Sequence, residues 1–543
     1  MHASDANRRN AAADRDRLLV RLDEGALLGV THAGIDSWRG IPYAAAPVGD
    51  LRLRAPAPPN PWRGVRDSFH FGTISAQLRR VRLGGGRTIE GSGEDCLTIN
   101  VHSPSNHPTG SPGLPVMVFI HGGGYSGGSS RDFSEQGDAF IHTSPVVYVS
   151  FNYRLGALGY LDFTRYSTPD RPFDSNLGLR DQIMALRWVR DNIRAFGGDP
   201  NNVTIFGESA GGNAITTLMA TPTAGGLFQR AIVQSAPPEA VYFPDATSEW
   251  ASEFVAVLAD QVGAAIDQEN VEAVNQFLAK ATVADLVQAS SVLQAHTPDA
   301  HPGTFCLAPV VDGVLLPEHP MTAFQAGRAH RVPLIIGTNA REGTLFRGRM
   351  DITPRSPARI HALFDEAPES AWAAMHAAYP GLPSPHEALD FGGDFGFWYP
   401  STRVADFHSR YAPVWAYRFD VAPTVLKLVG LDATHGLEMY TLFDQLDAPI
   451  ARVFTSLGGR RAYASAGARM RANWVRFATS NAPAASWPRY TTGTRSTLII
   501  DEIDRVENDP RSQRRLAWNG FLPHLADPTS AVIPARPPTQ DVA

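Results

Sequence analysis

Short apolar runs alternate with segments of helical periodicity over much of this chain. Between two of these runs, Leu179–Phe196 places its apolar residues at helical spacing. Continuous apolar runs suit strands that are buried on both faces of a sheet. The alternation therefore predicts an α/β fold with a large, mostly parallel central sheet flanked by helices. The expected strands are Pro115–Ile120, Pro145–Phe151, Asn202–Phe206, Arg230–Ser235 and Val332–Thr338.

A single domain is expected over residues 16–526. No low-complexity linker or repeat divides this range, and hydrophobic residues make up 43% of the chain, so a sizeable core can form. The stretches 245–300 and 356–379 are expected to be inserted helical regions. The two ends, 1–15 and 527–543, are polar or Pro-rich, and we expect flexible tails there.

The composition argues against several classes of function. The net charge of -6 disfavours nucleic acid as a partner. No apolar run is long enough to cross a bilayer, and the N-terminus lacks the apolar core of a secretory signal. The two cysteines, Cys96 and Cys306, form no disulfide framework. These features predict a cytoplasmic protein, and the preference for arginine over lysine indicates a GC-rich bacterial genome.

The segment Val203–Ile215 contains a G-x-S-x-G pattern centred on Ser209. A nucleophile that projects from a sheet edge sits on a very tight turn, and its neighbours two before and two after must be small. The turn would also place Ser209 at the start of a helix, where free amides favour an anion. The alternative is an ordinary strand–helix turn with a capping serine.

A second pattern, His121-Gly122-Gly123-Gly124-Tyr125, follows the expected strand Pro115–Ile120. Consecutive glycines allow backbone N–H groups to point at a carbonyl oxygen without side chains in the way. An acyl-transfer enzyme needs such donors for its developing oxyanion. A phosphate-binding loop is the alternative, but the G-K-[ST] sequence of such loops is missing.

In this order, the two patterns resemble those of the type-B carboxylesterase family, the relatives of cholinesterases within the α/β-hydrolase fold. The resemblance covers nearly the whole chain. It implies that the inserted helical regions cover an active site. The segments that carry it are Trp38–Asp67, Glu94–Val101, Asn152–Leu161, Asn176–Gln182 and Phe196–Gly212.

The resemblance also implies the partners of Ser209. A serine needs a base, and the base needs an orienting acid. The family's acid lies in an N-x-x-E-G motif, which matches Glu342 here, and Asp394 is a rival acid. The family's base lies in an H-G-x-E motif, which matches His435.

The same resemblance implies that the oxyanion donors are the amides of Gly123, Gly124 and Ala210. Glu208, beside the nucleophile, is expected to face the site and to influence the charge near His435. Neither a cofactor nor a metal is expected.

The implied activity is hydrolysis of small to medium, neutral or anionic carboxylic esters through an acyl-enzyme. Carbamates and aryl amides remain open as alternative substrates, and so does a binding protein that kept the fold without turnover. The expected partner is a small-molecule ester, and the protein is expected to be a monomer or a homodimer.

The chain departs from its secreted relatives at Ser75, which stands where a cysteine would pair with Cys96. The loop between them lacks the aromatic residue that holds choline in cholinesterases, so choline esters are not expected as dedicated substrates. Four arginines in this loop could instead attract esters that carry a carboxylate, or simply be solvated. They are Arg79, Arg80, Arg82 and Arg87.

Aromatic residues near Asp394 are a further open question. Phe395, Phe397 and Trp398 are candidates to line a substrate pocket, although aromatic residues at this spacing more often belong to a core.

Overall fold

The computed structural model describes residues 17–79, 87–88, 91–107, 112–132, 136–301, 303–347, 353–364 and 367–521. The expected tails lie outside these residues. So does most of the loop from Arg79 to Arg87, including Arg80 and Arg82.

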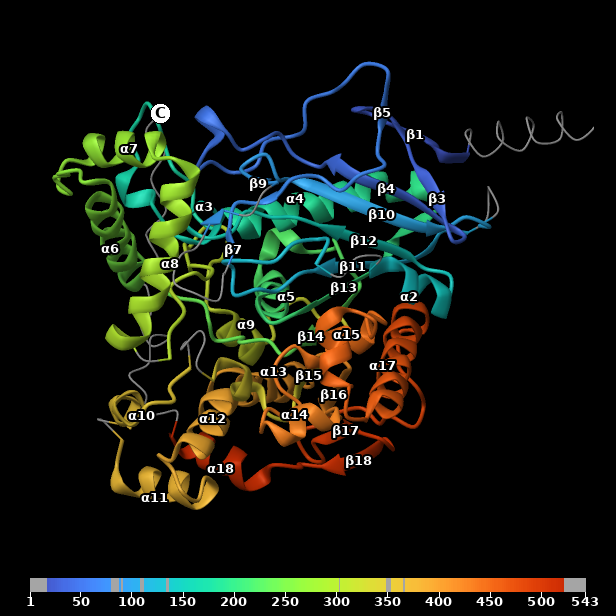
Figure 1. The fold of residues 1–543 in the computed structure, drawn as a ribbon, viewed down its shortest axis with the longest axis vertical. Coiled ribbons are helices and arrows are strands. Elements are labelled where there is room, and N and C mark those ends of the chain that lie inside the picture. Colours follow the sequence, from blue (N-terminus) through green and yellow to red (C-terminus); the bar gives the residue numbers. More distant parts are fainter. Residues whose placement is uncertain are drawn as a thin grey trace, which may run out of the picture.

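An eleven-stranded sheet runs through the described part of the chain (Figure 1). In sheet order its strands are β18 (Arg505–Asn508), β17 (Ser496–Ile500), β16 (Val414–Phe419), β15 (Leu334–Asn339), β14 (Arg230–Gln234), β13 (Gly198–Glu208), β11 (Leu114–Ile120), β12 (Val147–Phe151), β10 (Thr98–Pro104), β4 (Ile35–Pro42) and β3 (Val30–His32). The strands from β17 to β12 are parallel, and those at both edges are antiparallel. The prediction of a large, mostly parallel sheet is confirmed.

Smaller sheets flank the N-terminal half. They are formed by β1 (Leu19–Leu22), β2 (Gly25–Leu28) and β5 (Val65–Asp67), by β6 (Ile74–Ser75) with β9 (Ser92–Gly93), and by β7 (Leu78–Arg79) with β8 (Arg87–Thr88).

Both faces of the central sheet are buried. On β11, Val116 and Val118 belong to the core on one face, whereas Met117 and Phe119 belong to the core on the other. Adjacent residues of a strand point to opposite faces, so a strand between two cores needs apolar residues at every position. This explains why the sequence shows continuous apolar runs.

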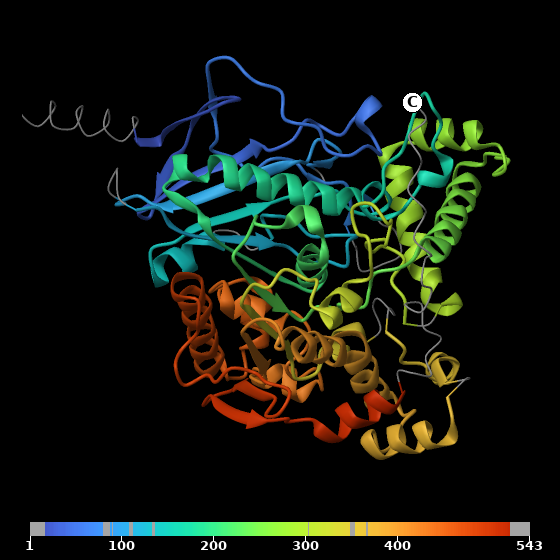
Figure 2. The same ribbon diagram turned by 180° about the vertical axis from the view of Figure 1, so that it is seen from behind.

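Helices cover each face. One face packs against α4 (Leu177–Asn192) and α5 (Ala210–Ala220), and the other against α17 (Arg460–Ser480). Figure 2 shows α4 lying across the sheet on the side opposite to the viewer of Figure 1.

The regions expected to be inserted helices gather along one side of the molecule, at the left in Figure 1 and at the right in Figure 2. The side-chain amide of Gln294 in this group donates a hydrogen bond to the carbonyl of Gly124 at 3.4 Å, which brings the helix that carries Gln294 against the glycine loop after β11. The helices of the expected regions are α6 (Pro244–Val262), α7 (Val271–Lys280), α8 (Val283–Ala300), α10 (Pro357–Phe364) and α11 (Glu369–Ala378). A further helix, α12 (Pro385–Gly393), follows beyond the expected boundary at residue 379.

The other α-helices are α2 (Gln136–Thr143), α3 (Ala157–Tyr160), α9 (Pro320–Ala326), α13 (Tyr399–His408), α14 (Thr424–Leu428), α15 (Leu437–Leu442), α16 (Pro449–Phe454) and α18 (Ser512–Phe521). The short 3₁₀ and π turns are η1 (Gly49–Leu51), η2 (Thr164–Tyr166), η3 (Ile193–Phe196), η4 (Pro222–Ala224), η5 (Glu342–Phe346) and η6 (Asp394–Trp398). Among the described residues, no helix is both long and apolar enough to cross a membrane.

Candidate active site

Ser209 occupies the tight turn between β13 and α5. Its backbone is left-handed, with φ 57° and ψ -123°, which is unfavourable for a residue with a side chain. Added Cβ atoms at Gly207 and Gly211 would lie 2.5 and 2.0 Å from the carbonyl oxygen of Ile120 on β11. Both flanking glycines are therefore required because β11 passes directly against the turn.

The glycine loop after β11 lies against this serine. A Cβ at Gly122 would lie 3.1 Å from the Cβ of Ser209, so loop and serine are in contact. Gly123 and Gly124 have φ values of 110° and 60°, which favour glycine. Within the described part of the chain, the amides of Gly123, Gly124 and Ala210 donate to no protein acceptor.

Glu342 lies just after β15, at the start of η5, and is buried. Its Oε1 atom accepts hydrogen bonds from the Ser235 hydroxyl at 2.7 Å and from the backbone N–H of Asn339 at 2.6 Å. Its Oε2 atom accepts from Nδ1 of His435 at 2.6 Å. Three donors from three segments therefore fix the position of this carboxylate.

The rival acid, Asp394, lies elsewhere. Its carboxylate is buried and pairs with Arg511 and Arg514, each at 2.8 Å, and it accepts a hydrogen bond from the Tyr379 hydroxyl at 2.7 Å. It is therefore part of an ion-pair network with α18, and Glu342 is the acid that meets His435.

His435 is buried between two carboxylates. Its second ring nitrogen, Nε2, lies 3.2 Å from Oε1 of Glu208, at an angle that makes no hydrogen bond. Burial by itself lowers the pKa of an imidazole, but the charges of Glu208 and Glu342 outweigh it and raise the pKa of His435 to about 9. Burial, reinforced by Glu342 and opposed by His435, raises the pKa of Glu208 to about 7.

A third buried carboxylate, Glu438, was missed by the sequence reasoning. It is fully buried, and its Oε2 atom accepts a hydrogen bond from the Asn339 side chain at 2.5 Å. Burial, together with the charges of Glu208 and Glu342, raises the pKa of Glu438 to about 8. The sequence did hold one signal for Glu438, because this residue is the last one of the H-G-x-E motif that contains His435.

Two aromatic rings cover the imidazole. The ring centroids of Phe346 and Phe397 lie 5.5 and 4.6 Å from that of His435, and the two phenyl rings stack with an interplanar angle of 4°. Phe305 packs against the pair. Of the three aromatic candidates, Phe397 therefore borders the site, whereas Phe395 packs against Trp518 of α18.

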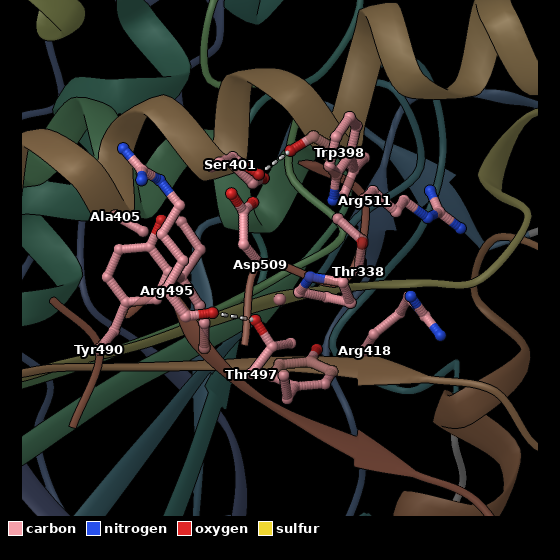
Figure 3. Close-up of a pocket in the computed structure, with 16 residues that line it drawn as sticks. Thr338, Trp398, Ser401, Ala405, Arg418, Tyr490, Arg495, Thr497, Asp509 and Arg511 are labelled. Carbon is pink, nitrogen blue, oxygen red and sulfur yellow. Dashed lines mark hydrogen bonds between the residues drawn. The ribbon is translucent and has the colours of Figure 1, made fainter. Parts of the chain in front are cut away.

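The third candidate, Trp398, lines a different pocket, between α13 and the C-terminal strands of the sheet (Figure 3). Three arginines also line this pocket, but Ser209, Glu342 and His435 do not. Each arginine is already paired with a carboxylate, which neutralises its charge inside the protein. The pairs are Arg418–Asp420, Arg495–Asp406 and Arg511–Asp394.

Both cysteines are free and buried. Ser75, at the position of the missing partner, donates a hydrogen bond to the carbonyl of Tyr153 at 2.5 Å. Burial raises the pKa of the Cys96 thiol to about 12, so this thiol stays protonated and unreactive.

Comparisons with known proteins identify the family. A family model described as the carboxylesterase family matches residues 16–518. The para-nitrobenzyl esterase of Bacillus subtilis (strain 168) is 35% identical, over 92% of this chain and 97% of its own. The fumonisin B1 esterase of Sphingopyxis macrogoltabida is 33% identical, over 88% of this chain and 86% of its own. A solved structure of a PNB esterase superposes with a TM-score of 0.76 at 34% identity, covering 92% of this chain and 99% of its own. The chain therefore belongs to the carboxylesterase family of α/β-hydrolases and is a carboxylic-ester hydrolase.

Proposed function

We propose that this protein hydrolyses small to medium, neutral or anionic carboxylic esters through an acyl-enzyme formed on Ser209. The observation that carries the proposal is that three separate segments of the chain contribute to one site. Ser209 stands on a strained turn, unpaired amides of the glycine loop lie beside it, and a hydrogen-bonded His435–Glu342 pair lies in the same site.

In the first step, His435 takes the proton of Ser209 as the hydroxyl attacks the ester carbonyl. The carbonyl oxygen becomes an oxyanion, which the amides of Gly123, Gly124 and Ala210 receive. His435 then gives the proton to the leaving alcohol. In the second step, water attacks the acyl group by the same path and releases the acid.

Glu342 holds the imidazole in one orientation throughout. Its two additional donors, Ser235 and Asn339, keep the carboxylate in place. Within the described residues, Ser209 Oγ has no hydrogen-bond partner. The hydrogen bond between a nucleophilic hydroxyl and its base is often long or poorly aligned before substrate binds, and it tightens in the complex.

A series of p-nitrophenyl esters from acetate to laurate tests the proposal. The wild type should turn over, the best chain length should report the size of the acyl site, and Ser209→Ala should remove turnover. Ser480→Ala, an exposed serine at the end of α17, is the matched control and should be fully active. Equal activity of Ser209→Ala and wild type would overturn the proposal.

A fluorophosphonate probe tests the nucleophile independently of the ester chosen. We expect it to label Ser209 in the wild type and to leave Ser209→Ala unlabelled. A folded wild type that neither turns over these esters nor reacts with the probe would indicate a binding protein.

A further inference from the structure

The three proposed oxyanion donors come from two different segments. Gly123 and Gly124 lie on the loop after β11, whereas Ala210 begins α5. A catalytic constellation must be held to within about 0.5 Å of its productive geometry. Glycines have no side chain with which to hold such a position, so any side-chain link from the loop to α5 has to come from another residue of the loop.

Tyr125, the residue after these glycines, supplies such a link. Its hydroxyl donates a hydrogen bond to Oδ1 of Asn213, one turn into α5, at 2.6 Å. Both side chains are buried. In the described part of the chain, this is the one side-chain hydrogen bond that joins the loop from Gly122 to Gly128 with α5.

The Asn213 side chain can take only one orientation. Its Nδ2 group donates to the carbonyls of Pro237 at 2.8 Å and Ala240 at 3.4 Å, so its oxygen must face Tyr125. Pro237 follows closely after Ser235, which binds the carboxylate of Glu342. Asn213 therefore ties the glycine loop and the nucleophile helix to the segment that also orients the acid.

Tyr125 itself is held in an unfavourable backbone conformation, with φ 54°. Its ring stacks on Tyr160 with centroids 3.8 Å apart, and its carbonyl accepts a hydrogen bond from the Gly156 amide at 2.7 Å. A strained conformation persists only where its surroundings fix it. The position of the hydroxyl is therefore set by the scaffold.

We infer that Tyr125 and Asn213 are a positioning pair, whose hydrogen bond sets the spacing between the glycine-loop amides and the amide of Ala210. This inference rests on the proposed function, because it assigns these amides to the oxyanion. Neither side chain touches the reacting atoms. The pair acts through the backbone, and its effect should appear where the oxyanion forms.

Tyr125→Phe tests the inference, since it keeps the ring stack and removes only the hydroxyl. We expect kcat/KM for p-nitrophenyl butyrate to fall about 10-fold, which is ~1.4 kcal/mol, almost wholly in kcat. The affinity for a trifluoromethyl ketone, which forms a tetrahedral adduct with serine, should fall by the same factor. KM should change less than about two-fold, because ground-state binding does not use these donors.

Tyr160→Phe is the matched control. It removes another buried hydroxyl of the same cluster, which accepts a hydrogen bond from Gln182 and does not reach α5. We expect its stability to fall while kcat and the ketone affinity stay within about two-fold of wild type. The same selective loss in Tyr160→Phe would overturn the inference, because general loosening would then explain both variants.

Asn213→Ser removes the acceptor of the same hydrogen bond. The double variant Tyr125→Phe/Asn213→Ser should lose little more kcat than the worse single variant, since one bond cannot be lost twice. Additive losses, or an unchanged kcat in folded Tyr125→Phe, would overturn the inference. If Ser209→Ala were as active as wild type, the proposed function would fail first, so the two failures are distinguishable.

Discussion

Nε2 of His435 lies 3.2 Å from Oε1 of Glu208, the residue immediately before Ser209. This is the ring nitrogen that must take the proton of Ser209 in the proposed mechanism. In the free protein the imidazole is thus stabilised as a cation between two carboxylates, and its pKa of about 9 reflects this. A cationic imidazole cannot act as a base, so the arrangement bears directly on the pH dependence of hydrolysis.

Glu208→Gln should therefore shift the pH profile of kcat/KM to lower pH. Removing one carboxylate destabilises the imidazolium and moves the pKa of His435 from about 9 toward the ordinary histidine value. The profile should be measured for wild type and variant from about pH 5 to 10. Glu318→Gln, on an exposed ion pair with Arg328, should leave the midpoint unchanged. A midpoint that does not move in Glu208→Gln would contradict this role of Glu208.

Glu438→Gln should become progressively more stable than wild type as the pH rises. The pKa of Glu438 is about 8 in the folded protein against an ordinary value of 4.5, so between these values the folded state holds a proton that the unfolded state has lost. The stabilising effect of this raised pKa is therefore complete at low pH and is lost as the pH rises to about 8. Glutamine has no such proton to lose.

Thermal unfolding at several pH values measures this effect. The Tm difference between Glu438→Gln and wild type should grow from about pH 5 to 8 and then level off. Parallel Tm curves over this range would show that Glu438 is ionised in the folded protein.

Gly211→Ala should strongly destabilise the protein. The new Cβ would lie 2.0 Å from the backbone carbonyl oxygen of Ile120, which is not the movable end of a side chain. We expect a loss of ~3 kcal/mol or more in the free energy of unfolding, at the upper end for overpacking. Gly520→Ala, in α18 with no atom within 4 Å of its Cβ, is the control. It should be neutral or stabilising, because alanine favours a helix by about 1 kcal/mol over glycine. Similar urea midpoints for the two variants would rule out the steric explanation.

Asp181→Asn should destabilise through the buried ion pair with Arg154. The two side chains are only 0% and 3% exposed, and they lie 2.6 Å apart. Removing one charge leaves the other buried and unpaired, which typically costs about 3–5 kcal/mol. Asp191→Asn breaks the Arg190–Asp191 pair, whose side chains are more than half exposed, and should change stability by less than about 1 kcal/mol. Chemical denaturation of both variants measures their stability. Equal losses of stability in the two variants would contradict this prediction.

The parallel centre of the sheet was predictable because its strands are buried on both faces. Five of its strands, β11 to β15, were predicted, whereas the parallel strands β16 and β17 and the edge strands were not. β4 carries Asp36 and Ser37 in its buried part, and these polar residues interrupt the apolar run that would have marked a strand. Asp36 is tolerated there because Arg17 pairs with it at 3.1 Å, a contact between segments that no local pattern reveals.

Local sequence alone determined the turn at Ser209 and the glycine loop, because both are steric demands of a few neighbouring residues. Resemblance to a family was needed to select Glu342 and His435, which lie 93 residues apart in the chain. The resemblance also implied that Glu208 faces the site near His435, but only the tertiary structure decided that Glu208 lies 3.2 Å from Nε2 and that Glu438 is buried nearby. It also decided that Tyr125 reaches Asn213. The charge state of a buried group depends on which charges and donors the other segments place around it, and hydrophobic periodicity carries no information about that placement.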